Sequence, residues 1–182
     1  MKQTTPLGKL LLLFVWSLLG YSAWSQTPTY ELYVTNQSQV DSKTYQFDVY
    51  MLRTGATALE LASMQFGLGI DTSIMNGGTL SFSYVSGSSQ LVSAQVPNSF
   101  QVGATYQTVN SVVYRYLNQS ARSGPGAGNG TVISAVKNGC SSPGTRIGTY
   151  RLTNTVDFRQ SSTCKHIFST SAASGRTNTL VS

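Results

Sequence analysis

Cys164 and His166 are the residues whose types and spacing could support nucleophilic catalysis. A cysteine–histidine pair needs both side chains within hydrogen-bonding distance and a third group that orients the histidine. His166 is the one histidine of the sequence, and Cys164 has a second cysteine, Cys140, as an alternative partner. We therefore expect His166 to be a surface residue and the pair to be non-catalytic.

The two cysteines, Cys140 and Cys164, are candidates for a disulfide. In an oxidising compartment a single pair is most simply a disulfide. Closing a loop of this length would stabilise the fold by about 3 kcal/mol. Free thiols and metal ligation are the alternatives, but two cysteines and His166 do not complete a four-ligand zinc site. The sequence predicts a Cys140–Cys164 disulfide.

Acidic residues could supply catalytic carboxylates or bind calcium, and the candidates are Glu31, Asp41, Asp48, Glu60, Asp71 and Asp157. A glycosidase needs two carboxyl groups about 5 to 9.5 Å apart, and distant residues could still meet in a folded sandwich. However, no aromatic cleft pattern accompanies any of them, and no Asp-rich loop offers clustered calcium ligands. We predict no enzyme, no cofactor and no metal site. Asp71 is expected to accept backbone hydrogen bonds in a turn.

Tyr33 and Tyr50 are the candidate ligand-binding residues. Each alternates with apolar neighbours, so its ring is expected on the face opposite the core. Exposed aromatic rings can stack on sugars or anchor a protein partner. The alternative is that both rings pack under a loop or stand singly exposed. The only tryptophans, Trp16 and Trp24, lie in the N-terminal leader described below, which weakens a prediction of crystalline-polysaccharide binding.

The segments that must position these side chains alternate between apolar and polar residues, which is the period of a strand. A register slip of one residue would turn each apolar stripe to solvent. The runs expected to be strands are Tyr30–Thr35, Tyr45–Leu52, Ala62–Ile70, Thr79–Val85, Val109–Leu117 (a central strand) and Ile147–Leu152. About seven to nine short strands predict an all-β fold, a β-sandwich of two antiparallel sheets.

Turns are expected where glycine and small polar residues gather. Arg53–Thr57 and Ser86–Ser89 are predicted turns, and Asp71–Gly78 is a predicted short helical turn or loop. Ser123–Gly130 is rich in glycine, but no Lys-Ser/Thr pair and no helix follow it, so it does not match a phosphate-binding loop. We predict a flexible surface loop there.

The N-terminal residues have the pattern of a signal peptide. Lys2 and Lys9 precede an apolar run over 10–19, and Ala23–Ser25 is a small-x-small cleavage site before Gln26. The run is shorter than the roughly 20 residues of a membrane span. We predict a leader over residues 1–25 and a secreted or cell-surface protein, with a retained signal anchor as the alternative.

The remaining chain has the composition of an extracellular β-module. Loss of Lys2 and Lys9 lowers the formal charge from +6 to +4, and the arginines are scattered along the sequence. Nucleic-acid binders concentrate such charge, so we predict no nucleic-acid partner and no membrane span in the mature chain. Residues 26–168 are the predicted sandwich, and 169–182 is an expected irregular tail, either a frayed end or the stump of a truncated protein.

Two segments resemble cohesin-like modules. The first, Tyr45–Leu80, reads YQFDVYMLRTGATALELASMQFGLGIDTSIMNGGTL, and it is similar to the front half of such a module, with Ile70, Asp71 and Ile74 at the corner that follows its second strand. The second, Pro143–Asn154, reads PGTRIGTYRLTN and is similar to a late strand. Both also resemble large secreted proteins of gliding and gut Bacteroidetes.

The resemblance covers about Glu31–Phe158 and implies a cohesin-like or carbohydrate-binding-module-like sandwich. The usual closing strand is not recognisable after Phe158, and no sorting domain follows Ser182. The leading hypothesis is a non-catalytic extracellular interaction module that serves adhesion or assembly, with a protein or polysaccharide as partner. The alternatives are a carbohydrate-binding module and a structural spacer with no ligand.

Overall fold

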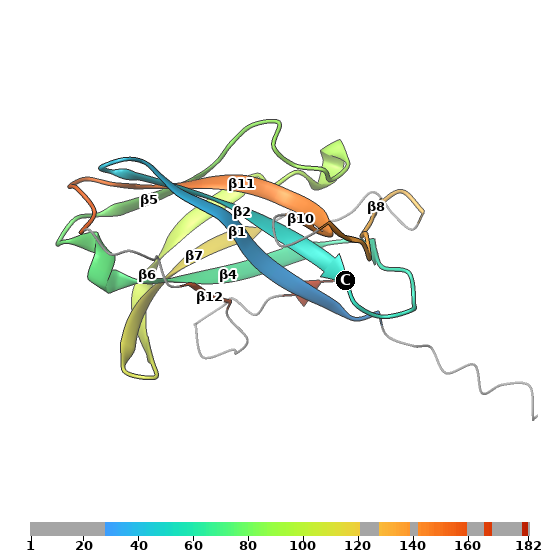
Figure 1. Ribbon diagram of the computed structural model, residues 1–182, viewed down its shortest axis with the longest axis horizontal. Helices are drawn as coiled ribbons and strands as arrows, with labels where there is room; N and C mark the ends of the chain where they lie inside the picture. The colour runs from blue at the N-terminus through green and yellow to red at the C-terminus, as the bar shows by residue number, and fades with distance from the viewer. Residues whose placement is uncertain (1–27, 121–127, 139–141, 160–165, 169–179, 182) are drawn as a thin grey trace, which may run out of the picture.

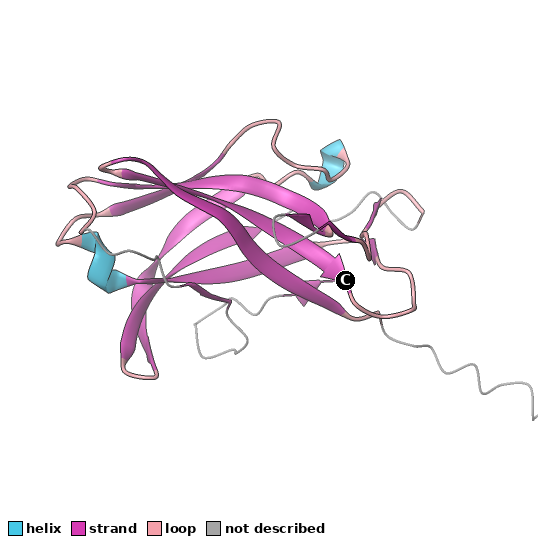
Figure 2. Cartoon of the chain, in the orientation of Figure 1, coloured by secondary structure: helices cyan, strands magenta, loops and turns pink. Residues whose placement is uncertain are grey.

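The computed structural model describes residues 28–120, 128–138, 142–159, 166–168 and 180–181 (Figure 1). The predicted leader, Cys140 and Cys164 lie outside these ranges, so the signal peptide and the disulfide stay predictions. Strands dominate the described chain, and its helices are two short 3-10 turns (Figure 2). No helix among the described residues is long and apolar enough to cross a membrane.

Two antiparallel sheets form a sandwich, which confirms the predicted fold class. The first sheet has the order β1-β2-β11-β5, in which the strands are β1 Tyr30–Asp41, β2 Thr44–Arg53, β11 Thr145–Asn154 and β5 Leu80–Tyr84. The second has the order β12-β4-β7-β6, with β13 also paired to β4. Its strands are β12 His166–Phe168, β4 Met64–Asp71, β7 Val112–Ser120, β6 Ser99–Val109 and β13 Leu180–Val181.

Short elements complete the described chain. They are β3 Glu60–Leu61 with β8 Thr131–Val132, β9 Lys137–Asn138 with β10 Ser142–Pro143, and the 3-10 helices η1 Thr72–Met75 and η2 Ser93–Gln95. Seven strands have five or more residues, and six shorter ones bring the total above the seven to nine expected.

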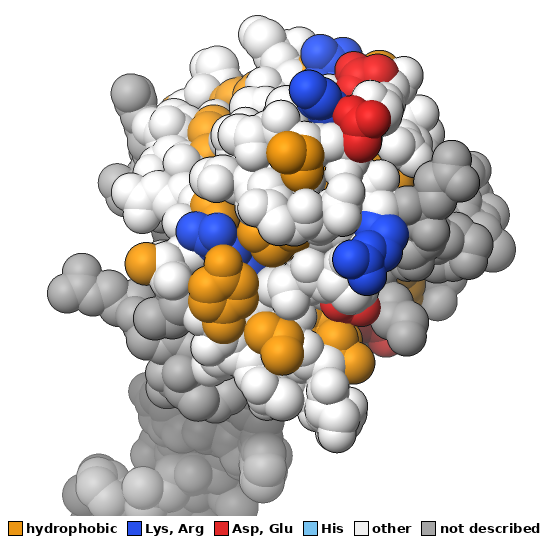
Figure 3. Space-filling model, turned by 90° about the vertical axis from the view of Figure 1, so that its left-hand side faces the viewer, with side chains coloured by type: hydrophobic (Ala, Val, Ile, Leu, Met, Phe, Trp, Pro, Cys, Tyr) orange, Lys and Arg blue, Asp and Glu red, His pale blue; other side chains and the backbone are white. Residues whose placement is uncertain are grey.

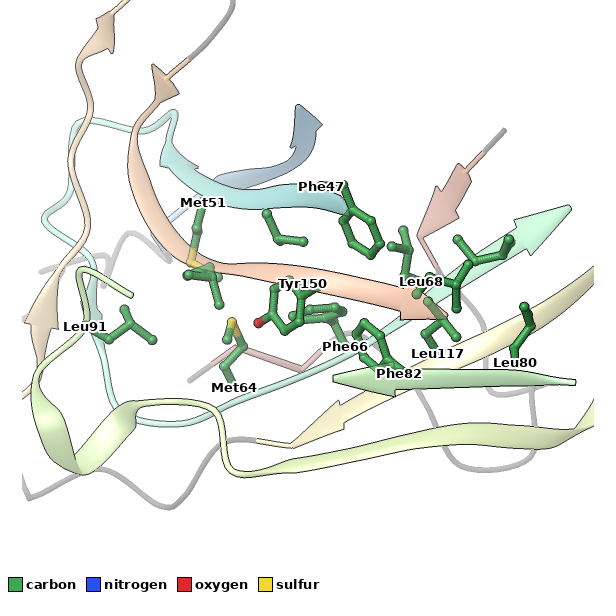
Figure 4. Close-up of a cluster of buried hydrophobic side chains, with 14 of the residues drawn as sticks. Phe47, Met51, Met64, Phe66, Leu68, Leu80, Phe82, Leu91, Leu117 and Tyr150 are labelled. Carbon is green, nitrogen blue, oxygen red and sulfur yellow. The ribbon is translucent and has the colours of Figure 1, made fainter. Parts of the chain in front are cut away.

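The core lies between the sheets because the alternating apolar residues of both point inward. Phe47 and Met51 of β2 face Phe66 and Leu68 of β4 across this interior, and all four are fully buried (Figure 4). Burial stabilises each such side chain by about 1.5–3 kcal/mol. These residues belong to the strands that alternation predicted.

Tyr150 of β11 occupies the centre of the core and joins the two sheets. Its ring stacks on Phe82 at 5.3 Å between centroids. Its hydroxyl donates a 3.0 Å hydrogen bond to Oε1 of Gln119, on β7 of the other sheet. Both residues are fully buried, and burial raises the pKa of Tyr150 well above its usual value.

The predicted strand Val109–Leu117 is wrong at its beginning. Val109 ends β6, Asn110 and Ser111 form a turn, and β7 begins at Val112. Both turn residues have positive φ, 50° and 65°, as a two-residue hairpin turn with the right-handed twist requires. The prediction that this region is central is confirmed, because β7 lies between β4 and β6.

Carboxylates hold one predicted turn and the end of the predicted glycine-rich loop. Asp71 Oδ1 accepts a 2.9 Å hydrogen bond from the backbone N–H of Ser73, which confirms its expected turn role. Glu60 accepts hydrogen bonds from the N–H groups of Gly128 and Gly130, at 3.0 and 2.6 Å. The end of the glycine-rich segment is therefore anchored to β3.

The expected irregular tail contains a strand. Leu180 and Val181 pair with Gln65 and Met64 of β4, so part of the segment 169–182 extends the second sheet. The rest of that segment lies outside the described residues.

Candidate functional site

Tyr33, Tyr50 and Arg146 form a row across β1, β2 and β11, which we call the facial row. Tyr33 lies directly opposite Tyr50, and Tyr50 lies opposite Arg146. The row is on the outer face of the first sheet, because Val49 and Met51, which flank Tyr50, point into the core. The structure thus brings the two predicted binding residues together.

The facial row exposes little aromatic surface. Tyr50 is 5% exposed, so its ring has no open face for a ligand, whereas Tyr33 is partly exposed. The Tyr33 hydroxyl donates to the Glu31 carboxylate. This hydrogen bond, together with partial desolvation and the negative charge of Glu31, raises the pKa of Tyr33 above its usual value. Binding at Tyr33 and Tyr50 stays a prediction.

A buried carboxylate lies beside the facial row. Both oxygens of Asp48 are occupied, since Thr149 Oγ1 donates to Oδ1 at 2.5 Å and Asn36 Nδ2 donates to Oδ2 at 2.7 Å. Asn36 has a positive φ of 50° and lies in an irregularity of β1 between Thr35 and Ser38. Asp48 therefore ties this irregular part of the edge strand to two neighbouring strands.

The other acidic residues also accept hydrogen bonds within the chain. Besides Glu31, Asp48, Glu60 and Asp71, the remaining two carboxylates accept hydrogen bonds from the backbone N–H of Lys43 (Asp41) and from Ser42 Oγ (Asp157), both at 2.8 Å. The Lys43 hydrogen bond is the main cause that lowers the pKa of Asp41. Among the described residues, no three His, Cys, Asp or Glu side chains gather as a metal site would require.

The hairpin of β6 and β7 carries a second pairing of tyrosine with arginine. Tyr106 of β6 lies opposite Arg115 of β7, which lies opposite Ile70 of β4. Burial decreases along this row, from the fully buried Ile70 to Tyr106, which is 54% exposed. The face of the second sheet that lines the core therefore extends beyond the core, and its side chains there are exposed to solvent. Figure 1 shows the turn end of this hairpin extending beyond the other strands of the sandwich.

Arg115 is fixed over Tyr106. Its guanidinium carbon lies 5.3 Å from the ring centroid, within the range of a cation–π contact. Its Nε donates to the carbonyl of Gly103 at 2.9 Å, and Nη1 donates to the Tyr106 hydroxyl at 3.3 Å. Gly103 lies in the irregularity between Val102 and Tyr106, so the irregular backbone supplies the acceptor that orients the arginine.

Thr108 and Val113 form the next cross-strand pair on the same face. Val113 is 40% exposed and Thr108 is also exposed. We call Tyr106, Thr108, Val113 and Arg115 the hairpin patch. Figure 3, which views the end of the molecule on the left of Figure 1, shows hydrophobic side chains next to basic ones. The patch combines an aromatic ring, an aliphatic side chain and a positive charge.

Sequence reasoning missed the hairpin patch. The usable signal was Asn110–Ser111 between Val109 and Val112, because asparagine readily adopts positive φ. His166 lies in β12 opposite Ile70, but its side chain is outside the described part and Cys164 is not described, so their predicted non-catalytic role is untested. No protein-family model, curated protein or solved structure matches the chain.

Proposed function

We propose that the chain is a non-catalytic extracellular interaction module, which binds a partner protein at the cell surface through the hairpin patch. Such binding would serve adhesion or the assembly of a larger secreted protein. The observation that carries this proposal is Tyr106, more than half exposed yet held under the Arg115 guanidinium. An exposed aromatic ring with a fixed position is what an interface anchor requires.

The composition of the patch supports protein recognition. Tyrosine and arginine are enriched among the residues that carry most of the binding energy at protein interfaces. Arg115 is already oriented by Gly103 and by the Tyr106 hydroxyl. Less side-chain entropy is therefore lost on binding, since the two long side chains are ordered beforehand. Val113 supplies apolar area beside them.

The sequence supports the extracellular setting. The predicted leader over 1–25, the low charge and the resemblance to cohesin-like modules all favour a secreted sandwich with a binding role. Sandwiches host many functions, so the fold by itself does not select one. The hairpin patch is what favours an interaction module over a spacer.

Carbohydrate binding at the facial row is the second candidate. Tyr33 is partly exposed, and its hydroxyl is held by the Glu31 carboxylate, so its ring could stack on the face of a sugar. Tyr33→Ala should then weaken retention on a glycan array, whereas Tyr106→Ala should not.

The test uses fluorescently labelled mature protein, residues 26–182, and intact cells of the producing organism. Tyr106→Ala should reduce cell binding at least about tenfold, which corresponds to about 1.4 kcal/mol. Val136→Ala is the matched control, since Val136 is 58% exposed but distant from the patch in the fold. Treatment of the cells with protease should abolish binding, and periodate oxidation of glycans should not.

Three results would count against the proposal. Equal binding of wild type and Tyr106→Ala would remove the role of the patch. Binding that survives protease but is lost after periodate would favour a glycan. Release of sugars from a polysaccharide panel by the purified protein would show that it is catalytic.

A further inference from the structure

β6 is an edge strand with an accessible backbone at its hairpin end. It is last in the order β12-β4-β7-β6, and no described strand pairs with its other side. Near the opposite end of β6, Phe100 packs against Phe82 and Tyr84 of β5. Tyr106, Thr108 and Val109 are exposed. At the end that carries the hairpin patch, no described strand covers this edge.

The hairpin geometry determines which backbone groups point outward. In a two-residue hairpin, the residues that flank the turn form a hydrogen-bonded pair, and such pairs then alternate along the strands. Val109 flanks the turn, so Gln107 also directs its N–H and C=O toward β7. Tyr106 and Thr108 direct theirs away from β7, toward the free edge.

This edge lacks the usual protection against strand pairing. Exposed edges are normally blocked by charged residues, proline or irregularities. β6 reads SFQVGATYQTV and contains neither a charge nor a proline, and its irregularity ends at Tyr106. By contrast, β1, at the edge of the first sheet, contains Glu31 and Asp41 and is irregular after Thr35.

We propose that this edge pairs antiparallel with the same edge of a second copy of the chain, around a twofold axis at Gln107. Tyr106 of each copy then lies opposite Thr108 of the other, and both residues have outward backbone groups that can exchange hydrogen bonds. The second sheet becomes continuous across the two copies. The inference rests on the proposed function, because it names a second copy as a partner of the hairpin patch.

Charge is compatible with this pairing. No charged residue of β6 faces its symmetry mate, because the strand has none. Arg115 lies one strand away, so the two copies of Arg115 would be separated by three strand spacings, about 14 Å. That separation exceeds the screening length of about 8 Å at physiological salt. A short edge buries little area, so the dimer should be weak, with a dissociation constant on the order of 100 µM.

Sedimentation of residues 26–182 between about 5 µM and 1 mM tests the inference over the range that such an affinity requires. Wild type should change from monomer to dimer. Gln107→Lys places two positive charges opposite each other across the twofold axis and leaves the backbone pairing to β7 intact. It should raise the dissociation constant at least tenfold. Gln107→Glu should do the same, and an equimolar mixture of the two variants should restore dimers.

Gln101→Lys is the matched control, since Gln101 is exposed on the same strand but outside the paired segment. It should dimerise as wild type does, and circular dichroism should show equal folding for all variants. A wild type that stays monomeric at 1 mM, or dimers insensitive to Gln107→Lys, would overturn the inference. If the monomeric protein still binds cells through Tyr106, only the inference fails. If it dimerises but Tyr106→Ala leaves cell binding unchanged, only the proposed cell-surface function fails.

Discussion

The facial row and the hairpin patch contain the same two residue types in the same arrangement, a tyrosine opposite an arginine on neighbouring antiparallel strands. Tyr50 is nevertheless buried, whereas Tyr106 is 54% exposed. Tyr50 lies on β2, with β1 on one side and β11 on the other. Tyr106 lies on an edge strand beyond the end of the core. Position in the sheet, rather than residue type, therefore separates a structural tyrosine from a candidate anchor.

The surroundings of the two tyrosines differ in the same way. Next to the facial row, Asp48 has both oxygens occupied and links three strands. In the hairpin patch, Arg115 uses its hydrogen bonds to hold its own hairpin in shape. The polar contacts beside the facial row stabilise the fold, whereas those of the hairpin patch hold an ordered surface that faces solvent.

Alanine at the two tyrosines should separate the regions most strongly. Tyr50→Ala removes a buried ring and should lower the free energy of unfolding by about 3 kcal/mol. Tyr106→Ala removes an exposed ring and its cation–π contact with Arg115, and should lower it by at most about 1 kcal/mol. Urea denaturation of both variants measures the difference. Equal destabilisation would mean that the two regions do not differ in role.

Asp48→Ala should have the next largest effect. It removes the acceptor of the buried Thr149 hydroxyl, and an unsatisfied buried polar group costs about 1–3 kcal/mol. Asp157→Ala is the control, because Asp157 is exposed and accepts its hydrogen bond from Ser42 at the surface. Thermal unfolding measures the effect. A midpoint temperature lowered equally by both substitutions would argue against a structural role specific to Asp48.

Conservative changes at Tyr106 should sharpen the hairpin side of the comparison. Tyr106→Leu removes the ring over which Arg115 is held, so Arg115 must be ordered on binding and cell binding should weaken about two- to fivefold. Tyr106→Phe keeps the ring beneath the guanidinium and should bind nearly as wild type does. If phenylalanine were as damaging as leucine, the hydroxyl rather than the ring would be the important group.

Glu31→Gln should have the smallest effect, seen mainly in the titration of Tyr33. The Glu31 carboxylate favours the protonated Tyr33 hydroxyl, so glutamine should lower the pKa of Tyr33 toward its usual value of about 10. Because the folded-state pKa is raised, this interaction contributes stability below pH 10 and loses it as the pH rises through the folded-state value. Nuclear magnetic resonance of the Tyr33 ring measures the shift, and Asp41→Asn should leave it unchanged.

Alternation was sufficient to predict most of the sandwich from the sequence. Phe47, Val49 and Met51 repeat at every second position of β2, and a stripe of this kind can be buried in only one register. The same pattern placed Tyr33 and Tyr50 opposite the core. It did not reveal that Tyr50 is buried, because the cover on an outer face comes from residues distant in sequence.

β6 was missed for a different reason. Phe100 and Val102 begin an alternating stripe, but Gly103 and Ala104 interrupt its apolar side before Tyr106. Tyr106 returns to the face of Val102, because their partners on β7, Arg115 and Leu117, are two residues apart. The hairpin patch therefore depends on a backbone irregularity that periodicity does not detect.

The hydrogen bond between Tyr150 and Gln119 affects how the molecule melts. It joins β11 to β7 across the hydrophobic core. If one sheet slid over the other, the Tyr150 hydroxyl and the Gln119 side-chain oxygen would lose this hydrogen bond while surrounded by hydrocarbon side chains, which is costly. Intermediates with displaced layers are thereby disfavoured, so heating should disassemble both layers in one all-or-none transition.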